Sequence, residues 1–164
     1  MAQRGIREFD GKQMMARHWK AYFGDLPAYH GKVALVTPET SYDQLRKEHP
    51  WLTEGKLVVK PDQLFGKRGK HGLVKVANTL DEARAWTDER MDKEATVGKV
   101  TDKLNCFLIE PFTPHKEEYY VAIKSVRDGD VIYFSNHGGV DIESVWDTVA
   151  EIKVGVGEEI KQGD

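Results

Sequence analysis

The sequence predicts an α+β fold made of two pieces, and three observations support this prediction. Between about residues 33 and 109, short apolar runs alternate with segments that carry helix-capping signals. After about residue 110, two apolar runs flank an Asp-Gly turn, which is typical of a β-hairpin. The 164 residues are enough for one compact domain or two small subdomains.

The first piece is predicted to hold three helices. Asp10 is a candidate cap for a helix that runs to about Phe23. Two further helices, over residues 41–48 and 79–91, open on capping boxes, in which Ser or Thr precedes Gln or Glu by three residues. Strands are predicted at the apolar runs 33–36, 57–60, 73–76 and 106–112.

The second piece is predicted to be richer in strands. Residues 119–126 and 131–135 flank the turn 127–130, whose sequence is Arg-Asp-Gly-Asp. A short helix is expected within residues 140–150, and a further strand over residues 152–156. We therefore expect the two α+β pieces to meet near residue 110.

Composition narrows the function classes. The chain is 40% hydrophobic and 31% charged, with a net charge of -3, which argues against general binding to nucleic acid or a membrane surface. No apolar run approaches the roughly 18 residues of a membrane-spanning helix, and the N-terminus lacks the apolar region of a signal peptide. The single cysteine, Cys106, excludes an internal disulfide and fits a reducing cytoplasm.

A basic, glycine-rich loop follows the second predicted strand. Residues 56–75 hold six Lys or Arg against one acid, Asp62, and the strand itself carries Lys60. Glycines at both ends and in the middle of the loop 66–72 allow its backbone N–H groups to approach a ligand, so that loop and cations form a candidate anion site. A solvated basic loop is the alternative. The loop is not a Walker A motif, because Lys70 is followed by His rather than Ser or Thr.

An apolar strand that becomes a proline-fixed connector is the second candidate for a ligand site. Residues 107–114 read Phe-Leu-Ile-Glu-Pro-Phe-Thr-Pro, and the free backbone groups of this hinge could read an adenine edge. Glu117 and Glu118 follow directly. Either carboxylate could bind ribose hydroxyls, or both could be solvated at the start of a strand.

Several segments together resemble the ATP-grasp region of the ATP-citrate lyase family. They are LVVKPDQLFGKRGKHGLV, EATVGKVTDKLNCFLIEPFTPHKEEYYVAI, GGVDIESV, HPWL and TLDEARAW, and they are spread over nearly the whole chain. The β subunit of succinyl-CoA synthetase shares the strand lysine, the loop and the Gly-Gly-Val segment more loosely. The start AQRGIREFDGKQMMA resembles the separate-subunit prokaryotic form.

The resemblance implies an ATP-grasp fold, in which nucleotide is held between two lobes. Residues 19–109 would form a complete first lobe, and residues 1–18 and 110–164 the start of an incomplete second lobe. The chain is then expected to be the N-terminal part of a longer protein. The family's Mg²⁺ ligands, citrate and CoA domains and phosphohistidine loop would all come later.

The resemblance also implies an ATP site. In the family the strand lysine and the loop Arg-Gly pair contact phosphates, the hinge backbone receives adenine, and a glutamate holds the ribose. Many relatives carry Val where this chain has Thr, a change that a backbone contact survives. The segment 138–141, Gly-Gly-Val-Asp, is expected near the phosphates or as support for their loop. The residues that inherit these contacts are Lys60, Arg68, Gly69, Pro111, Thr113 and Glu118, with Glu110, Gly138 and Gly139 as further candidates.

The activity implied for the parent protein is that of ATP-citrate lyase, a cytoplasmic enzyme of the reductive tricarboxylic acid cycle. ATP phosphorylates an enzyme histidine, the phosphoryl group passes to citrate, and CoA gives citryl-CoA, which is cleaved to acetyl-CoA and oxaloacetate. Citrate and CoA would bind to other parts of the enzyme, and a companion lyase or CoA-binding subunit would complete a hetero-oligomer. This chain would bind ATP with Mg²⁺, would hold no catalytic residue or metal ligand, and alone would be inactive.

Two alternatives remain open from the sequence. One is the ATP-grasp subunit of a citryl-CoA or succinyl-CoA synthetase, and the other is a noncatalytic nucleotide-binding or assembly module. His137 precedes two glycines but lacks the Gly-His-Ala-Gly setting of the family's phosphorylated histidine, so we do not expect it to be the nucleophile. Cys106 is expected to be a small core residue, and the four tryptophans to serve packing.

Overall fold

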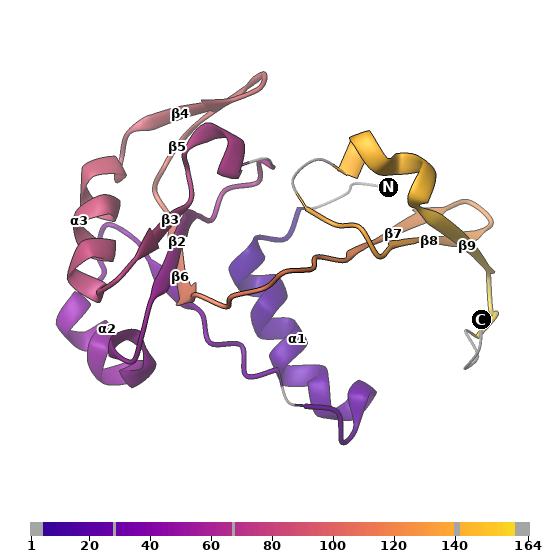
Figure 1. Ribbon diagram of the computed structural model, residues 1–164, viewed down its shortest axis with the longest axis horizontal. Coiled ribbons are helices and arrows are strands. Elements are labelled where there is room, and N and C mark those ends of the chain that lie inside the picture. The colour runs from indigo at the N-terminus through magenta and orange to yellow at the C-terminus, as the bar shows by residue number, and fades with distance from the viewer. Residues whose placement is uncertain (1–4, 28, 67, 140–141, 160–164) are drawn as a thin grey trace. The chain divides into compact units, whose positions relative to one another are not determined.

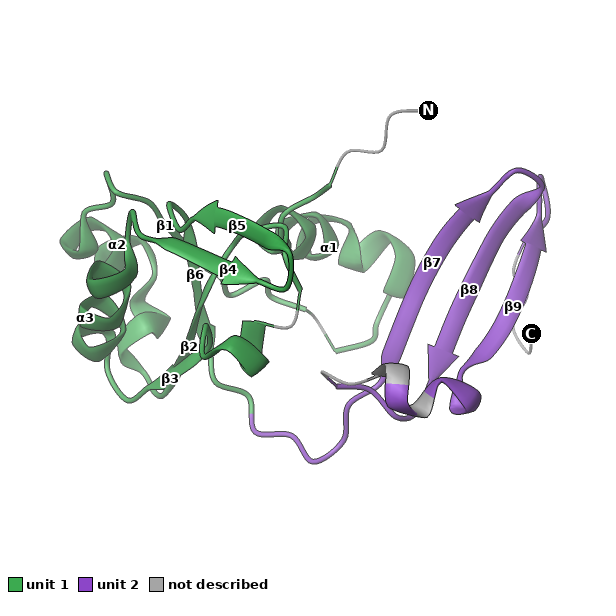
Figure 2. Cartoon of the chain, turned by 90° about the horizontal axis from the view of Figure 1, so that it is seen from above, with its two compact units in different colours: residues 1–113 green, residues 114–164 purple. Residues whose placement is uncertain are grey.

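The structure is a computed structural model that describes residues 5–27, 29–66, 68–139 and 142–159. Contacts within the chain divide it into unit 1, Met1–Thr113, and unit 2, Pro114–Asp164, which are coloured separately in Figure 2. Each unit has a sheet of its own. The lobe boundaries expected from the sequence, with residues 1–18 in the second lobe, stay a prediction.

Unit 1 is built on a four-stranded antiparallel sheet with the strand order β1-β6-β2-β3. The strands are β1 (Ala34–Val36), β2 (Leu57–Pro61), β3 (Lys75–Ala77) and β6 (Phe107–Pro111). Three of them begin within one residue of the predicted position. The third predicted strand begins at Lys75 rather than at Leu73, because the Leu73 N–H is donated to the Arg68 carbonyl at 3.0 Å and closes the preceding turn.

The two faces of this sheet differ in chemistry. Alternate residues of β2 and β6, such as Val59 and Ile109, are fully buried in the hydrophobic core. Because side chains alternate along a strand, Lys60 and Glu110 fall on the opposite face. Figures 1 and 2 show helices α2 (Tyr42–Glu48) and α3 (Leu80–Arg90) on one side of the sheet and helix α1 (Glu8–Phe23) on the other.

Side-chain caps fix the starts of α2 and α3, as the sequence predicts. The Ser41 hydroxyl accepts from the Gln44 N–H at 3.4 Å, and the Thr79 hydroxyl accepts from the Glu82 N–H at 3.1 Å. A single-turn helix at Pro50–Thr53 follows α2, and its Leu52 is fully buried. These caps could be predicted from the sequence because each one involves only residues that lie three positions apart.

Helix α1 differs from its prediction in two respects. It begins at Glu8 with Arg7 as N-cap residue, so the prediction that Asp10 caps it is wrong, and Asp10 lies in the first turn. None of its residues is buried, and predicted apolar positions such as Met15 and Tyr22 are exposed. Its contacts with other parts of unit 1 include the Gln13 side chain, which donates to the Gly31 carbonyl at 3.2 Å, and the Trp19 ring, which lies 5.7 Å from the Tyr29 ring.

A hairpin that the sequence analysis did not predict follows α3. Strands β4 (Glu94–Val97) and β5 (Val100–Lys103) pair with each other in a two-stranded sheet. Gly98 takes a φ of 63° in the tight connection, a conformation that glycine adopts without strain. All four residues of β5 are exposed, so no alternation of buried and exposed positions marks the strand.

Unit 2 is a three-stranded antiparallel sheet with the order β7-β8-β9. Its strands are β7 (Tyr120–Val126), β8 (Gly129–Ser135) and β9 (Ala150–Gly155), and a 3-10 helix at Ile142–Thr148 stands where a short helix was expected. Figure 1 shows this helix joining β8 to β9. The Trp146 ring lies 5.6 Å from the Tyr133 ring and 6.3 Å from the Tyr120 ring, a packing role as predicted for the tryptophans.

The β7–β8 turn is tighter than the predicted four-residue turn. Val126 already pairs with Gly129, which leaves Arg127 and Asp128 as the turn. Gly129 has a φ of 147°, and a Cβ placed on it would lie 2.0 Å from the Val154 carbonyl oxygen. Glycine is thus required here because the backbone of β9 approaches too closely for any side chain.

The described residues combine helices with antiparallel sheets, which confirms the predicted α+β class. Cys106 is 4% exposed and directly precedes β6, as expected for a small core residue. In the part of the chain that the structure describes, no helix has the length and apolar character needed to cross a membrane.

Candidate functional site

Five charged side chains on the face of the unit 1 sheet opposite its core form an ion cluster: Glu8, Lys12, Lys60, Arg68 and Glu110. The Lys60 Nζ lies 2.7 Å from Glu8 Oε1 and 2.8 Å from Glu110 Oε1. Glu8 Oε1 also accepts from Lys12 at 2.8 Å, while its Oε2 accepts from the Arg68 guanidinium. Lys12 bonds the second oxygen of Glu110 as well. The cluster therefore joins α1, β2, β6 and the basic loop.

The start of α1 is held over the sheet by a cap from another element. Asp62, which directly follows β2, is 1% exposed, and its carboxylate accepts from the Glu8 N–H at 3.0 Å and from the Phe9 N–H at 3.4 Å. The N–H groups of a first helical turn have no partner within the helix, and the N-cap residue Arg7 makes no side-chain hydrogen bond to them. The Asp62 carboxylate supplies the missing hydrogen-bond acceptor. This contact sets Glu8 beside Lys60.

Contacts within the ion cluster stabilise the charged forms of Glu8 and Lys12. Burial acts to raise the pKa of Glu8, but hydrogen bonds from Lys12, Lys60 and Arg68 outweigh it and lower that pKa from 4.5 to about 2. Burial acts to lower the pKa of Lys12, yet its bonds to Glu110 and Glu8 leave that pKa raised. Three cations face two carboxylates, so the cluster has a formal charge of +1 within a chain of net charge -3.

The basic loop turns back towards β2. Residues 68–71 form a 3-10 turn, and the Arg68 guanidinium donates to the Pro61 carbonyl at 2.5 Å in addition to Glu8. Gly69 is exposed, and Gly72 takes a φ of 67°, a conformation that glycine adopts without strain. The approach of this loop to a ligand stays a prediction. His71 is exposed, and Lys67 lies outside the described residues.

The predicted adenine hinge follows β6. Pro111 is the last residue of β6 and pairs with Leu57, and the next N–H, that of Phe112, is donated to the Lys56 carbonyl at 2.8 Å. The expectation that this hinge offers free backbone N–H groups is therefore wrong at Phe112. Thr113 is exposed and ends unit 1.

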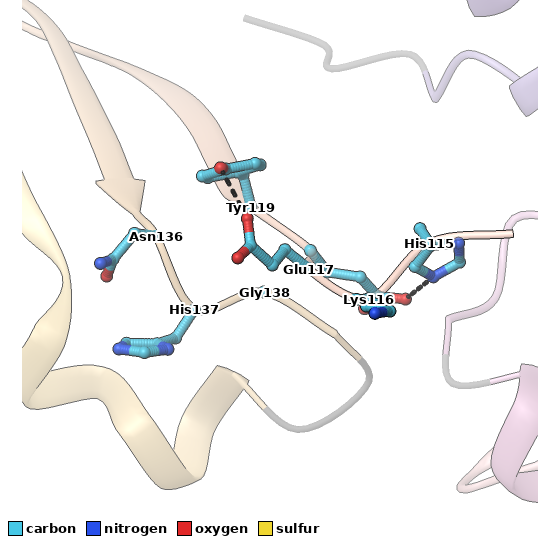
Figure 3. Close-up of a pocket in the computed structure, with 8 residues that line it drawn as sticks. His115, Lys116, Glu117, Tyr119, Asn136, His137 and Gly138 are labelled. Carbon is cyan, nitrogen blue, oxygen red and sulfur yellow. Dashed lines mark hydrogen bonds and ion pairs between the residues drawn. The ribbon is translucent and has the colours of Figure 1, made fainter.

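Unit 2 has an open hollow of about 580 Å³ where its chain enters and leaves the β7–β8 pair. Residues before β7 line it, together with residues after β8, and Figure 3 shows the labelled side chains around the space. The lining residues are His115, Lys116, Glu117, Glu118, Tyr119, Asn136, His137 and Gly138. The Glu118 carboxylate lies 2.7 Å from a ring nitrogen of His115, and the Glu117 carboxylate accepts from the Tyr119 hydroxyl at 3.3 Å.

Two consecutive glycines, Gly138 in the lining of this hollow and Gly139 after it, pack closely against residues 118–119. The Gly138 N–H is donated to the Glu118 carbonyl at 2.7 Å, and a Cβ on Gly138 would lie 2.6 Å from the Tyr119 backbone. Gly139 has a φ of 108°, and a Cβ there would lie 2.9 Å from the Glu118 carboxylate. Both glycines therefore permit a close approach to Glu118. Val140 and Asp141, which complete the predicted segment, lie outside the described residues.

The structure thus brings the predicted site residues into two groups. Lys60, Arg68 and Glu110 meet in the ion cluster of unit 1, next to Pro111. Glu118 meets Gly138 and Gly139 in unit 2. Across the described ranges, no group of three or more His, Cys, Asp or Glu side chains is arranged to hold a metal ion. His137 is exposed on the edge of the hollow.

Glu8, Lys12 and Asp62 are the residues of the ion cluster and its support that the sequence analysis missed. Glu8 and Lys12 are four residues apart, a spacing that pairs charges on one face of a helix. That spacing is common on solvated helices, so it carries no sign of a site by itself. In the sequence, Asp62 stood out only as the single acidic residue among residues 56–75.

The family model for the ATP-citrate synthase ATP-grasp domain matches residues 2–164 of the chain. Among solved structures, ATP citrate lyase from Methanothrix soehngenii in complex with citrate and coenzyme A is 51% identical to this chain, with a TM-score of 0.85. That similarity covers 97% of this chain and 37% of the Methanothrix chain. A mutant ATP citrate lyase from Methanosaeta concilii in complex with (3S)-citryl-CoA is 46% identical, with a TM-score of 0.80. This similarity covers 97% of this chain and 35% of the Methanosaeta chain.

Curated relatives give the same result. ATP-citrate synthase from Bos taurus is 43% identical over the whole chain, which corresponds to 15% of the bovine protein. ATP-citrate synthase subunit alpha chain protein 1 from Oryza sativa subsp. japonica is 42% identical over 93% of the chain and 37% of the rice protein. The chain therefore spans well under half the length of these relatives.

Proposed function

The chain belongs to the ATP-citrate synthase ATP-grasp family, and from that membership we propose that it is the ATP-binding segment of an ATP-citrate lyase. The proposed overall reaction converts citrate, CoA and ATP into acetyl-CoA and oxaloacetate through a phosphohistidine. The share of this chain is to bind ATP and to position its phosphates. Phosphoryl transfer depends largely on such positioning and on electrostatic stabilisation.

The convergence of Lys60 and Arg68 on one carboxylate carries this proposal. Two cations that contact the two oxygens of Glu8 are also close enough together to contact neighbouring oxygens of one phosphate group. They come from a strand and from a glycine-containing loop, and the exposed backbone at Gly69 adds room for an anion to approach. We assign the phosphates to Lys60, Arg68 and Gly69.

We assign the remaining contacts with ATP to the hinge and to unit 2. Adenine is proposed to contact the backbone at Pro111 and Thr113, and ribose hydroxyls the Glu118 carboxylate. Gly138 and Gly139 are proposed to support Glu118, as their close approach to it favours. Glu110 is proposed to act through its contact with Lys60 rather than on the nucleotide directly.

For magnesium, the further substrates and the partner subunit, we propose that they take part but assign them no residues of this chain. The described side chains do not by themselves fit a metal ion, so we derive no step through Mg²⁺ and propose only that it accompanies the nucleotide. Citrate and CoA are proposed to bind to other parts of the enzyme, together with a companion lyase subunit. Oligomeric assembly, cytoplasmic location and a place in the reductive tricarboxylic acid cycle stay predictions.

The proposal is tested by replacing Lys60 in the full protein that contains this chain. Lys60→Met should lower kcat/KM for ATP by about 10- to 100-fold, since a lost bond to a charged group is worth on the order of 1.5–3 kcal/mol. KM for citrate should stay unchanged. Steady-state kinetics of acetyl-CoA formation at varied ATP and varied citrate give both values.

Lys75→Met is the matched control. Lys75 also lies on a strand of unit 1 and also pairs with a glutamate, Glu82, at 2.8 Å, but it takes no part in the ion cluster. Its replacement should leave kcat/KM for ATP within about twofold of wild type. Equal losses in the two variants, or an unchanged value in Lys60→Met, would remove Lys60 from the ATP site.

A further inference from the structure

Helix α1 presents an acidic residue to both cations that we assign to the ATP phosphates. Glu8 contacts Lys60 with one carboxylate oxygen and Arg68 with the other. All three side chains are largely enclosed, with exposed fractions of 24%, 16% and 19% for Glu8, Lys60 and Arg68. Neither the family match nor the descriptions of the relatives assigns a role to Glu8.

The backbone of Glu8 has a contact that involves neither of the two cations. Asp62, at the end of β2, accepts from the backbone N–H groups of Glu8 and Phe9. Lys12, one helical turn later, bonds Glu8 at 2.8 Å and also bonds Glu110. The carboxylate is therefore held from its backbone and from its side.

We propose that Glu8 is a positioning residue of the phosphate site, which holds Lys60 and Arg68 in one orientation before nucleotide arrives. This inference rests on the proposed function, because it assumes that these two cations contact phosphate. Lysine and arginine side chains have many rotamers, and ordering them opposes binding when it must happen on association. A carboxylate that orders both cations beforehand reduces that cost.

The charges of the cluster are compatible with an incoming anion. Lys60 has three N–H donors, and within the described part of the chain its ammonium group pairs with two carboxylates, those of Glu8 and Glu110. A donor thus remains for a phosphate oxygen. Lys12 offsets the negative charge of Glu8, so that the cluster keeps a formal charge of +1.

A competing role for Glu8 predicts the opposite sign. If its carboxylate merely occupied the place of a phosphate group, its removal would expose two cations and would tighten ATP binding. If it positions the cations, its removal weakens ATP binding although a negative charge has been lost. The direction of the change in KM for ATP therefore separates the two roles.

The test compares three variants in the full protein that contains this chain: Glu8→Gln, Glu8→Asp and Glu82→Gln. Glu82 is the control, because it also pairs with a lysine at 2.8 Å and its pKa is also lowered to about 2, yet it lies outside the ion cluster on α3. KM for ATP, KM for citrate and kcat are measured for each variant. Lys60→Met is measured beside them as the reference for the ATP site.

We expect Glu8→Gln to raise KM for ATP about tenfold, with a smaller change in kcat and no change in KM for citrate. Glu8→Asp, which keeps the charge on a shorter side chain, should recover part of the loss, and Glu82→Gln should match wild type. A merely structural Glu8 would instead lower kcat through loss of folded enzyme and leave KM for ATP unchanged. Thermal unfolding of each variant identifies that case, and Glu8→Asp supplies the test if Glu8→Gln fails to fold.

Failure of this inference differs from failure of the proposed function. If Lys60→Met weakens the use of ATP but Glu8→Gln leaves KM for ATP unchanged or lowers it, the positioning role is overturned and the ATP site stands. If Lys60→Met has no effect on ATP kinetics, the phosphate assignment is wrong, and the positioning role falls with it.

Discussion

Glu8 has an acidic side chain whose ionised form is stabilised by three cations. Its pKa is lowered from 4.5 to about 2, because the bonds from Lys12, Lys60 and Arg68 outweigh the effect of burial. A depressed folded-state pKa contributes stability that is fully present above the unfolded pKa and is lost as the pH falls towards the folded pKa. The contribution of Glu8 should therefore disappear between about pH 4.5 and pH 2.

We predict that the difference in free energy of unfolding between wild type and Glu8→Gln shrinks as the pH is lowered through this range. One pKa unit corresponds to about 1.4 kcal/mol, so the loss is at most on the order of 3 kcal/mol, and solvent screening reduces it. Urea unfolding at several pH values measures it. Burial raises the pKa of Asp62, which acts in the opposite sense in both proteins, and in wild type the charge of Glu8 adds to that rise. A difference that stays constant from pH 5 to pH 2.5 would show that the ion cluster does not depress this pKa.

The sequence could single out only those candidate site residues that stand in a distinctive local pattern. Lys60 and Arg68 stood out because a lysine in an apolar strand and a glycine-rich basic loop are both unusual. Glu8 and Lys12 form an ordinary helical charge pair, and only the fold brings them beside Lys60, which lies 52 positions after Glu8 and 48 after Lys12. The assignment of Glu118 to ribose stays a prediction.

At the scale of the elements, the N-terminus of α1 is capped by Asp62, the residue that directly follows β2. Asp62 accepts two of the helix's first N–H groups, whereas Asp10, which the sequence favoured as the cap, is exposed in the first turn. No residue of α1 is fully buried, and this cap and the ion cluster are two contacts that hold its start. The helix should accordingly be sensitive to changes at Asp62.

We predict that Asp62→Ala destabilises the protein by about 1–3 kcal/mol, because it leaves the Glu8 and Phe9 N–H groups without their partner. Asp10→Ala should change the stability by no more than about 0.5 kcal/mol. Urea unfolding of both variants at neutral pH gives the two values. Equal and small effects of the two substitutions would mean that the Asp62 cap contributes nothing to the stability of α1.

Elements with local signals could be predicted, and elements defined by distant pairing could not. The starts of α2 and α3 followed from their Ser41 and Thr79 caps. The β4–β5 hairpin was missed because its strands are short and mostly exposed, so that neither length nor alternation marks them. The position of β6 between β1 and β2 depends on pairing between residues that lie 46 (Pro61 and Phe107) to 75 (Ala34 and Ile109) positions apart, which local patterns do not encode.

At the scale of the whole molecule, the charge distribution agrees with a local anion site in a chain that is acidic overall. The net charge is -3, while the ion cluster has a formal charge of +1 and lies beside the basic loop. The proposal that these cations bind phosphates, and that Glu118 in unit 2 binds ribose, is compatible with membership in the ATP-grasp family, and both assignments stay predictions.

The most direct test is a crystal structure of the full protein that contains this chain, with a non-hydrolysable ATP analogue bound. We predict phosphate oxygens within about 3 Å of the Lys60 ammonium and the Arg68 guanidinium, with Glu8 still in contact with both cations. The ribose hydroxyls should lie at the same distance from the Glu118 carboxylate, and adenine beside the backbone of Pro111 and Thr113. A nucleotide whose phosphates lie beyond ion-pair distance of both Lys60 and Arg68 would contradict the proposed site.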